Sequence, residues 1–238
     1  MMTVHSVSKT IGRRPIVQNV SFEVGDGRIT GFVGPNGAGK STTMRIMLGL
    51  TGAGSGVTRF DGVEYRRVPV PLAAVGSLID ARALIPDLRT RHVLDHCART
   101  QDMAPRTSEL LERVGLADAM DRRVRHLSLG MRQRLGIAVA LLGAPGNLVL
   151  DEPLNGLDPD GIHWLRGLLR DLRSQGCAIL LSSHIVSELA LVVDDIVVMV
   201  EGRVVATGPL SELAAARGGT LEDVYRDVVA AGTAGVRR

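Results

Sequence analysis

The sequence predicts an α/β domain with a mostly parallel sheet and a helical insertion in the middle of the chain. Short apolar runs rich in Val and Ile alternate with longer segments of helical period, the pattern of strands connected by helices. Hydrophobic residues make up 45% of the chain but aromatic residues only 3%, so aliphatic side chains must build the core. At 238 residues the chain is long enough for one large domain with an inserted subdomain.

Four short apolar runs are the expected strands of the sheet: 29–33, 147–150, 178–182 and 196–200. From about Ala81 to Ala144 there are few β-branched runs, and helices are expected over 91–99, 108–114 and 129–142. Two closely spaced prolines at 68–71 disfavour both helix and central strand and mark the approach to this insertion, and the segment 143–146 marks its exit.

The last part of the chain is expected to hold two short helices, over 209–216 and 221–230, before a disordered tail of small residues over 232–238.

Composition excludes several protein classes. The chain has 28 basic and 25 acidic residues, a net charge of +3, without the clustered basic face of a nucleic-acid binder, so no nucleic-acid partner is expected. Cys97 and Cys177 are too few and too far apart for a disulfide framework, which indicates a reduced, intracellular protein. The N-terminus lacks a signal-peptide pattern, and no stretch approaches the roughly 18 apolar residues of a membrane span. The chain is therefore expected to be soluble by itself.

The stretch GPNGAGKST at residues 34–42 matches the phosphate-binding template G-x-x-x-x-G-K-[ST] completely. An expected strand precedes it and a helix-forming run follows, which is the context that this motif needs. Backbone N–H groups of the glycine-rich turn and of the helix N-terminus can surround phosphate oxygens. Lys40 is one of only two lysines and supplies a compact charge that can reach the β- and γ-phosphates. The expected nucleotide-binding residues are Gly34, Pro35, Asn36, Gly37, Ala38, Gly39, Lys40, Ser41 and Thr42.

Two carboxylates, Asp151 and Glu152, follow the expected strand 147–150. Asp151 suits holding Mg²⁺ opposite Ser41, and Glu152 can take a proton from an attacking water as general base. Two acids after a strand often form only a solvated turn, but the phosphate-binding motif favours the catalytic interpretation. A phosphate-binding loop alone leaves kinases, GTPases and many ATPases open.

The stretch LSLGM at residues 127–131 opens the last helix of the insertion. In isolation Ser128 is an ordinary helix N-cap. In this position, between the phosphate-binding loop and the two acids, the sequence resembles the nucleotide-binding subunit of an ABC transporter, whose signature reads LSGGQ. The resemblance implies that this stretch closes on the γ-phosphate of ATP held by a second copy of the chain, in a head-to-tail homodimer that forms on ATP binding. The signature residues are Ser128, Leu129, Gly130 and Met131.

Two later stretches extend the resemblance, which covers residues 2–230. NGLDP at 155–159 resembles the D-loop, which implies that Asp158 faces the partner chain. SSH at 182–184 resembles the H-loop, which implies that His184 lies near the γ-phosphate, although a histidine after a strand is often structural. The implied catalytic residues are Glu152, His184 and Lys40.

The resemblance also implies a fold, a P-loop NTPase core with a mostly parallel sheet, an antiparallel β portion near the N-terminus and an inserted α-helical signature subdomain. The expected organisation is a single ABC ATPase domain over 1–238. Its nucleotide-binding core is expected over 1–80 and 145–208, its helical subdomain over 81–144 and a short C-terminal extension over 209–238.

Two positions depart from the family pattern. Ile11 stands where the family usually places an aromatic ring that stacks on adenine, so the preference for adenine is in doubt. Asp80 stands where the Q-loop glutamine is expected, and its carboxylate can accept hydrogen bonds or hold Mg²⁺ but loses an amide donor. The alternative is that Asp80 is an ordinary loop acid, displaced by one residue from the true position.

The function implied by the resemblance is an ATP-hydrolysing subunit that uses ATP and Mg²⁺, with Ser41, Asp151 and Asp80 as metal residues. The stretches at 150–159, 181–184 and 220–225 are most similar to drug and antibiotic exporters whose membrane half is a separate permease chain. The implied location is cytoplasmic, at the inner face of the membrane through that permease. Two alternatives stay open: a soluble ABC ATPase acting on a scaffold such as that of iron–sulfur cluster assembly, and a nucleotide-gated binding module, against which Glu152 argues.

The insertion has three further features. His92 and His96 share a helix face beside Cys97, but no third ligand is near in sequence, so an ordinary surface is expected. The basic run 122–125 is interpreted as a solvated face. Leu84 and Ile85 are expected to line a groove for a helix of the membrane subunit. The arginines expected at the rim of that groove are Arg82, Arg89 and Arg91.

Overall fold

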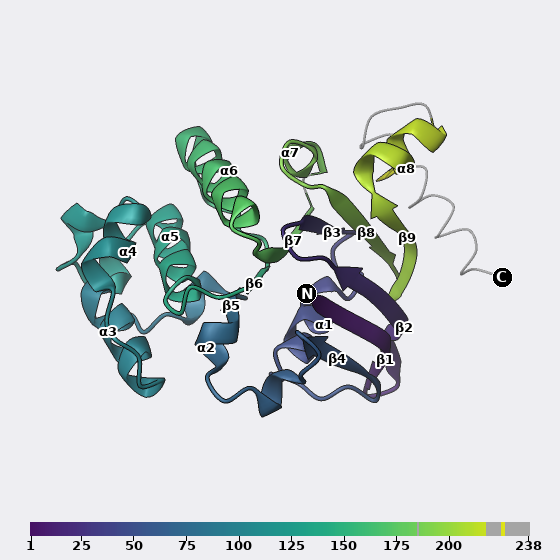
Figure 1. Ribbon diagram of the computed structural model, residues 1–238, viewed down its shortest axis with the longest axis horizontal. Coiled ribbons are helices and arrows are strands. Elements are labelled where there is room, and N and C mark those ends of the chain that lie inside the picture. Colours follow the sequence, from purple (N-terminus) through teal and green to yellow (C-terminus); the bar gives the residue numbers. More distant parts are fainter. Residues whose placement is uncertain (185, 218–224, 227–238) are drawn as a thin grey trace.

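The centre of the molecule is a six-stranded sheet with the strand order β5-β6-β7-β3-β8-β9 (Figure 1). This computed structural model describes residues 1–184, 186–217 and 225–226. Neighbouring strands from β5 to β8 are parallel, and β9 runs antiparallel to β8. The strands are β3 (Ile29–Val33), β5 (Val75–Leu78), β6 (Asn147–Leu150), β7 (Ala178–Ser183), β8 (Asp195–Val200) and β9 (Arg203–Pro209).

A second, antiparallel sheet has the order β2-β1-β4, with β1 over Met2–Ile11, β2 over Arg14–Val24 and β4 over Ser55–Phe60. The two sheets meet where the Gln18 backbone N–H donates to the Gly202 carbonyl at 2.7 Å. Helix α1 (Lys40–Met47) buries Met44 and Met47 in the same apolar cluster as Phe22 of β2 and Phe32 of β3. This cluster fixes the start of α1, and so the phosphate-binding motif, relative to both sheets.

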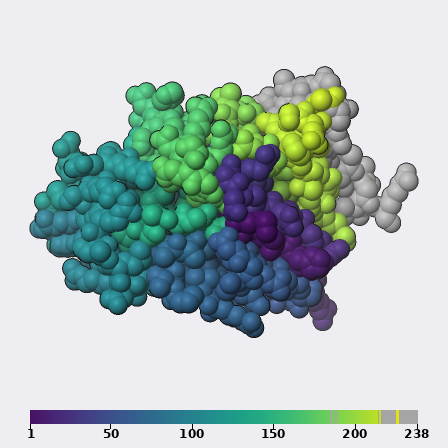
Figure 2. Space-filling view, in the orientation of Figure 1, coloured from purple at the N-terminus to yellow at the C-terminus, as the bar shows by residue number. Residues whose placement is uncertain are grey.

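The helices between β5 and β6 form one end of the molecule (Figures 1 and 2). They are α3 (Thr90–Thr100), α4 (Thr107–Arg113) and α5 (Leu129–Ala140), with short 3₁₀ turns at Ala81–Ala83, Ala117–Ala119 and Val124–His126. The remaining elements are the 3₁₀ turn Tyr65–Arg67, the one-turn helix α2 (Pro71–Ala74), and the helices α6 (Pro159–Ser174), α7 (Val186–Ala190) and α8 (Leu210–Arg217).

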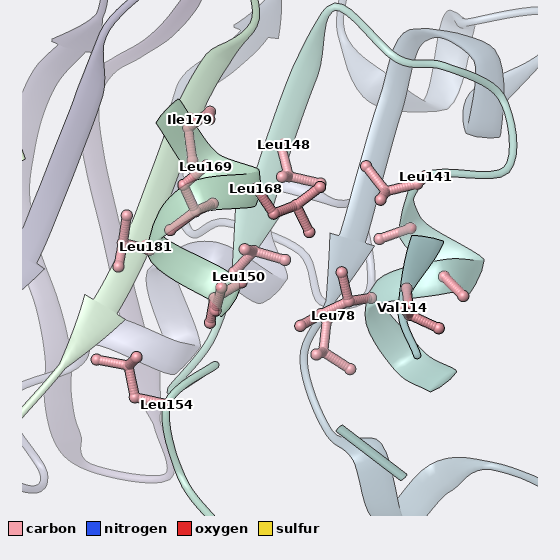
Figure 3. Close-up of a cluster of buried hydrophobic side chains, with 14 of the residues drawn as sticks. Leu78, Val114, Leu141, Leu148, Leu150, Leu154, Leu168, Leu169, Ile179 and Leu181 are labelled. Carbon is pink, nitrogen blue, oxygen red and sulfur yellow. The ribbon is translucent and has the colours of Figure 1, made fainter. Parts of the chain in front are cut away.

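One continuous apolar cluster joins this helical part to the central sheet (Figure 3). Leu78 and Leu150 come from the sheet, Leu168 and Leu169 from α6, and Leu141 from the end of α5. All five are 6% exposed or less. Because buried aliphatic area is the main favourable term in folding, this cluster fixes the helical part firmly against the sheet.

Trp164 lies at the junction between α6 and the helical part. Its indole Nε1–H donates to the Arg113 carbonyl at 3.1 Å, at the end of α4. The Arg134 guanidinium of α5 lies 4.3 Å from the centre of the tryptophan ring, and its Nη1 donates to the Val114 carbonyl at 2.9 Å. A stacked cation and a partly buried indole hydrogen bond thus connect α6 to α4 and α5.

The predicted fold class is confirmed: the sheet is mostly parallel, an antiparallel portion is formed near the N-terminus, and helices fill the segment between β5 and β6. The four predicted strands are observed, as are the helices predicted at 91–99, 108–114, 129–142 and 209–216, with ends shifted by one or two residues. The expectation for 68–71 is wrong at its end, because Pro71 begins α2, where its fixed φ suits the first helical position.

The division into a core, a helical subdomain and a C-terminal extension stays a prediction. The helix predicted at 221–230, apart from residues 225–226, and the tail at 232–238 lie outside the described residues.

Candidate functional site

The phosphate-binding motif forms a tight turn between β3 and α1. A Cβ on Gly34 would lie 2.1 Å from the Met199 carbonyl oxygen, and a Cβ on Gly39 would lie 2.6 Å from the Ile16 carbonyl oxygen. Gly39 also has a φ of 107°, which side chains rarely adopt. Neither position accepts a side chain, so the backbone of the turn packs directly against β2 and β8.

The Lys40 side chain is folded back into this turn. Its Nζ donates to the Gly34 carbonyl at 2.6 Å and to the Pro35 carbonyl at 3.3 Å, and the residue is only 6% exposed. Burial lowers the pKa of Lys40, and the nearby carboxylates Glu152 and Asp151 oppose that shift. A buried ammonium whose hydrogen bonds go to carbonyl oxygens is stabilised electrostatically by a nearby anion, and a polyphosphate supplies such an anion.

The turn opens into a cavity of about 360 Å³. Ile11 lies on its wall with 55% of its surface exposed, and Glu152 lines it together with the phosphate-binding turn. The full lining is Ile11, Ile16, Asn36, Gly37, Ala38, Gly39, Lys40, Ser41, Thr42 and Glu152. The structure therefore brings together the expected base-covering residue, the phosphate-binding turn and the expected general base.

Asp151 and Glu152 follow β6 at the edge of the sheet where the parallel strands end. Asp151 is 9% exposed, and its Oδ1 accepts from the Ser182 hydroxyl at 2.5 Å. The Glu152 backbone N–H donates to the same hydroxyl at 2.9 Å. Glu152 Oε2 lies 2.8 Å from His184 Nδ1, so the histidine predicted from SSH contacts the predicted general base directly.

Ser182 and Gln133 are site residues that the sequence reasoning did not single out. The sequence indicates Ser182 only as the start of the H-loop pattern, whereas its hydroxyl contacts both acids. Gln133 of α5 is 5% exposed, and its Nε2 donates to the Glu152 carbonyl at 3.2 Å. The available signal was polarity, because Ser182 follows the apolar run AILL and Gln133 lies in a helix that is mostly buried.

The signature stretch begins α5, away from the cavity just described. Ser128 caps the helix by accepting from the Met131 backbone N–H at 3.2 Å. A Cβ on Gly130 would lie 2.7 Å from the Gly156 carbonyl oxygen, and a Cβ on Gly156 would lie 2.5 Å from the Leu129 side chain. The signature stretch and the predicted D-loop therefore pack against each other within this chain.

The predicted D-loop residue, Asp158, caps helix α6. Its Oδ1 accepts from the Gly161 backbone N–H at 2.8 Å, and the residue is exposed. Asp80 likewise caps a 3₁₀ turn by accepting from the Arg82 backbone N–H at 2.8 Å, and it is not among the residues that line the cavity. Both carboxylates thus have local structural roles, and their predicted roles toward a partner and a metal stay predictions.

The expected docking segment is only partly free. Leu84 is half-buried against the main core, whereas Ile85 is 51% exposed. Arg89 and Arg91 pair with Asp121 at 3.4 and 3.1 Å. Leu84 packs against the chain's own core and two of the arginines already pair with Asp121, so the groove for a helix of the membrane subunit stays a prediction.

The residues around the cavity fit a nucleoside triphosphate and its metal. The phosphate-binding turn admits no side chain at Gly34 or Gly39, and Lys40 lies beneath it. Ser41 and Asp151 supply hydroxyl and carboxylate oxygens, the ligand type that Mg²⁺ prefers. Among the described residues no group of three or more His, Cys, Asp or Glu side chains is placed to hold a metal, so phosphate and water oxygens would complete the shell.

A comparison with protein families decides between the enzyme classes that share this motif. The family model described as ABC transporter matches residues 17–155. The chain belongs to the ABC transporter family. The prediction of an ATP-binding ATPase subunit of this family is confirmed.

Two ABC transporter relatives cover most of the chain. The lantibiotic transport ATP-binding protein SrtF of Streptococcus pyogenes is 39% identical over 206 residues, which are 86% of this chain and 89% of that protein. The bacitracin transport ATP-binding protein BcrA of Enterococcus faecalis is 36% identical over 217 residues, which are 90% of this chain and 70% of that protein.

Solved structures of this family share the fold. The ATP-binding subunit of an ABC transporter superposes with a TM-score of 0.88 at 28% identity, covering 96% of this chain and 99% of that one. A dimeric ATP-binding cassette, MJ0796, in a post-hydrolysis state with ADP and Pi has a TM-score of 0.80 at 22% identity, covering 88% and 98%. Across the ranges that the structure describes, no helix is both long and apolar enough to cross a membrane.

Proposed function

We propose that this chain hydrolyses ATP to energise the export of an antibiotic peptide or a similar amphipathic compound through a separate membrane subunit. The observation that carries the catalytic part is the placement of Glu152, in contact with His184, on the wall of the cavity that holds Lys40. The export part is supported by relatives named for lantibiotic, bacitracin and Nod factor transport or export.

The residues divide the chemistry between them. Lys40 and the N–H groups of the turn bind the phosphates, and Ile11 covers part of the base. Mg²⁺, held by Ser41 and Asp151 when bound, would neutralise charge on the phosphate oxygens. His184 donates to Glu152 Oε2, because an ionised carboxylate can only accept, and this leaves Oε1 to receive the proton of the attacking water.

The active form is proposed to be a homodimer with ATP between the two copies. The signature stretch lies outside the cavity of its own chain, and Ser128 and Leu129 are both exposed. An exposed helix N-terminus of this kind can face the nucleotide of a second copy, as the family resemblance implies. The dimeric state of the MJ0796 cassette supports the same arrangement.

The membrane subunit and the location follow from the same proposal. The chain would sit at the cytoplasmic face of the membrane, held there by a permease with its own membrane-spanning helices. Asp80, whose Oδ1 caps the turn at Ala81–Ala83, is proposed to contribute to the metal site together with Ser41 and Asp151.

The test is purification of the tagged chain from membranes, with identification of the membrane protein that co-purifies with it. We expect a stable complex whose ATPase rate rises with the transported compound, and a complex with Glu152→Gln that forms equally well but does not turn over. Purification of the chain free of any membrane protein, with full ATPase activity on a soluble scaffold, would contradict the export proposal.

A further inference from the structure

A single buried hydroxyl connects the two acidic residues of the site. Ser182 Oγ donates to Asp151 Oδ1 at 2.5 Å and accepts from the Glu152 backbone N–H at 2.9 Å. A serine hydroxyl has one donor and two acceptor positions, so both bonds can exist together. Ser182 is 0% exposed, so bulk water does not compete for either bond.

The register of the sheet explains how these groups meet. Leu150 of β6 lies opposite Leu181 of β7 in a parallel pair. The residue after Leu150 is Asp151 and the residue after Leu181 is Ser182, so these two residues also lie next to each other. The Ser182 hydroxyl can therefore reach the Asp151 carboxylate. A shift of one residue in this register would turn the hydroxyl to the other face and break both bonds.

The backbone of Glu152 is held in an uncommon conformation. Its φ is 49°, in the left-handed region that non-glycine residues seldom occupy. Such a conformation persists where the surroundings fix it from several sides. Here Ser182 binds the N–H of Glu152, and Gln133 of α5 binds its carbonyl at 3.2 Å.

We propose that Ser182 is a positioning residue that sets Asp151 and Glu152 relative to each other. This inference rests on the residue roles proposed above, in which Asp151 helps to hold Mg²⁺ and Glu152 accepts the proton of the attacking water. Ser182 touches neither nucleotide nor metal in that scheme and acts through the two acids. Gln133 binds Glu152 and has no hydrogen bond to Asp151 within the described part of the chain, so Ser182 and Gln133 should have separable effects.

The test compares Ser182→Ala with Ser182→Thr, which keeps the hydroxyl. For Ser182→Ala we expect kcat to fall about 10- to 100-fold, as for other residues that orient metal ligands, with the KM for ATP changed less than about threefold. Binding of a fluorescent ATP analogue in EDTA should equal that of the wild type, whereas the tightening that Mg²⁺ produces should shrink. Ser182→Thr should recover most of both properties.

The variant Gln133→Leu tests the support of Glu152 separately from that of Asp151. Because the Glu152 carbonyl is the one partner of the Gln133 side chain among the described residues, this variant should lower kcat while keeping the wild-type effect of Mg²⁺ on nucleotide binding. An equal loss of the Mg²⁺ effect in Gln133→Leu and Ser182→Ala would contradict the assignment of Ser182 to Asp151.

The matched control is Thr30→Val on the neighbouring strand β3. Thr30 is 1% exposed, and its hydroxyl has no hydrogen-bond partner among the described residues, so its removal tests the loss of a buried hydroxyl from the same sheet. We expect wild-type kcat and a wild-type response to Mg²⁺. Melting temperatures of all variants identify losses that come from unfolding.

Two outcomes would overturn the inference: a Ser182→Ala protein that keeps both the wild-type kcat and the wild-type effect of Mg²⁺, or one whose loss of activity matches its unfolded fraction. If the wild type binds nucleotide without turnover, the proposed catalytic roles of Glu152 and His184 fail, and Ser182 is still tested by the Mg²⁺ effect on nucleotide binding. An unchanged Mg²⁺ effect would then reject the role of Ser182.

Discussion

His184 Nδ1 lies 2.8 Å from Glu152 Oε2, and this contact joins the ends of the neighbouring strands β6 and β7. The imidazole holds one carboxylate oxygen in place. In the proposed mechanism Glu152 is the general base, and a base fixed in this way does not have to be reoriented in each turnover, which is how preorganised groups lower a barrier.

The first prediction concerns this base. Glu152→Gln removes the proton acceptor but keeps the shape, so ATP hydrolysis should fall by about 10²- to 10⁴-fold while ATP binding changes little. Size-exclusion chromatography with MgATP should then show an accumulated dimer. Glu23→Gln, an exposed position on β2, is the matched control. Unchanged hydrolysis in Glu152→Gln would remove this residue from the mechanism.

The second prediction concerns the wall of the cavity. Ile11→Tyr places a ring where an exposed aliphatic side chain now lines the nucleotide cavity, and should tighten ATP by about 1–2 kcal/mol, or roughly 5- to 30-fold in Kd. GTP should gain as well, because both purines offer a π-face. Ile11→Leu is the control without a ring and should change neither Kd. Equal affinities in all three proteins would place the base elsewhere.

The third prediction separates the two apolar residues of the expected docking segment. Ile85→Ser should keep the melting temperature and disrupt co-purification with the membrane subunit, because Ile85 is 51% exposed. Leu84→Ser should lower the unfolding free energy by roughly 1–3 kcal/mol, because Leu84 packs against the core. Thermal unfolding of the isolated chain and pull-down from membranes measure the two effects. Intact complex formation by Ile85→Ser would move the docking surface away from this segment.

The fourth prediction concerns the two cysteines. Burial raises the pKa of the Cys177 thiol to about 11, and burial also raises the pKa of Cys97, which is only partly covered. Because the thiolate is the reactive form, iodoacetamide at pH 8 should label Cys97 first and Cys177 only on unfolding. Mass spectrometry of the labelled peptides gives the order. Equal rates at both sites in the native protein would contradict the burial of Cys177.

The same shift has a consequence for stability. Cys177 keeps its proton to a higher pH in the folded chain than in the unfolded one. Its contribution to the free energy of unfolding is therefore complete below about pH 9 and is lost as the pH rises toward about 11. Urea unfolding across this range should show a steeper loss for the wild type than for Cys177→Ala, with Cys97→Ala as the control.

The central strands could be predicted because they are buried on both faces, as in Ile29–Val33, and so read as continuous apolar runs. The strands β1, β2 and β4 were not located individually. Their exposed faces carry charged and polar residues, and Ser6 and Asn19 have positive φ values that interrupt the alternation. Strand β5 has only four residues, of which Gly76 and Ser77 give no strand signal.

The site also has residues that the sequence predicts and contacts that it does not predict. The phosphate-binding turn is continuous in sequence, so its residues could be named from the motif alone. The bond from Ser182 to Asp151 depends on the register between β6 and β7, and the bond from Gln133 to Glu152 depends on how α5 packs against the sheet. Neither arrangement leaves a local pattern, so the sequence could not reveal these contacts.

The junction at Trp164 supplies the protein with its own optical probe. Trp164 is the chain's one tryptophan. Its indole N–H donates to the Arg113 carbonyl at the end of α4, and the Arg134 guanidinium of α5 lies over its ring. Indole emission depends on the hydrogen bond and on the nearby charge, so any rotation of α4 and α5 against α6 would change its wavelength and intensity. Rapid-mixing fluorescence of the unlabelled chain with nucleotide would therefore show whether such a rotation takes place and how fast it is.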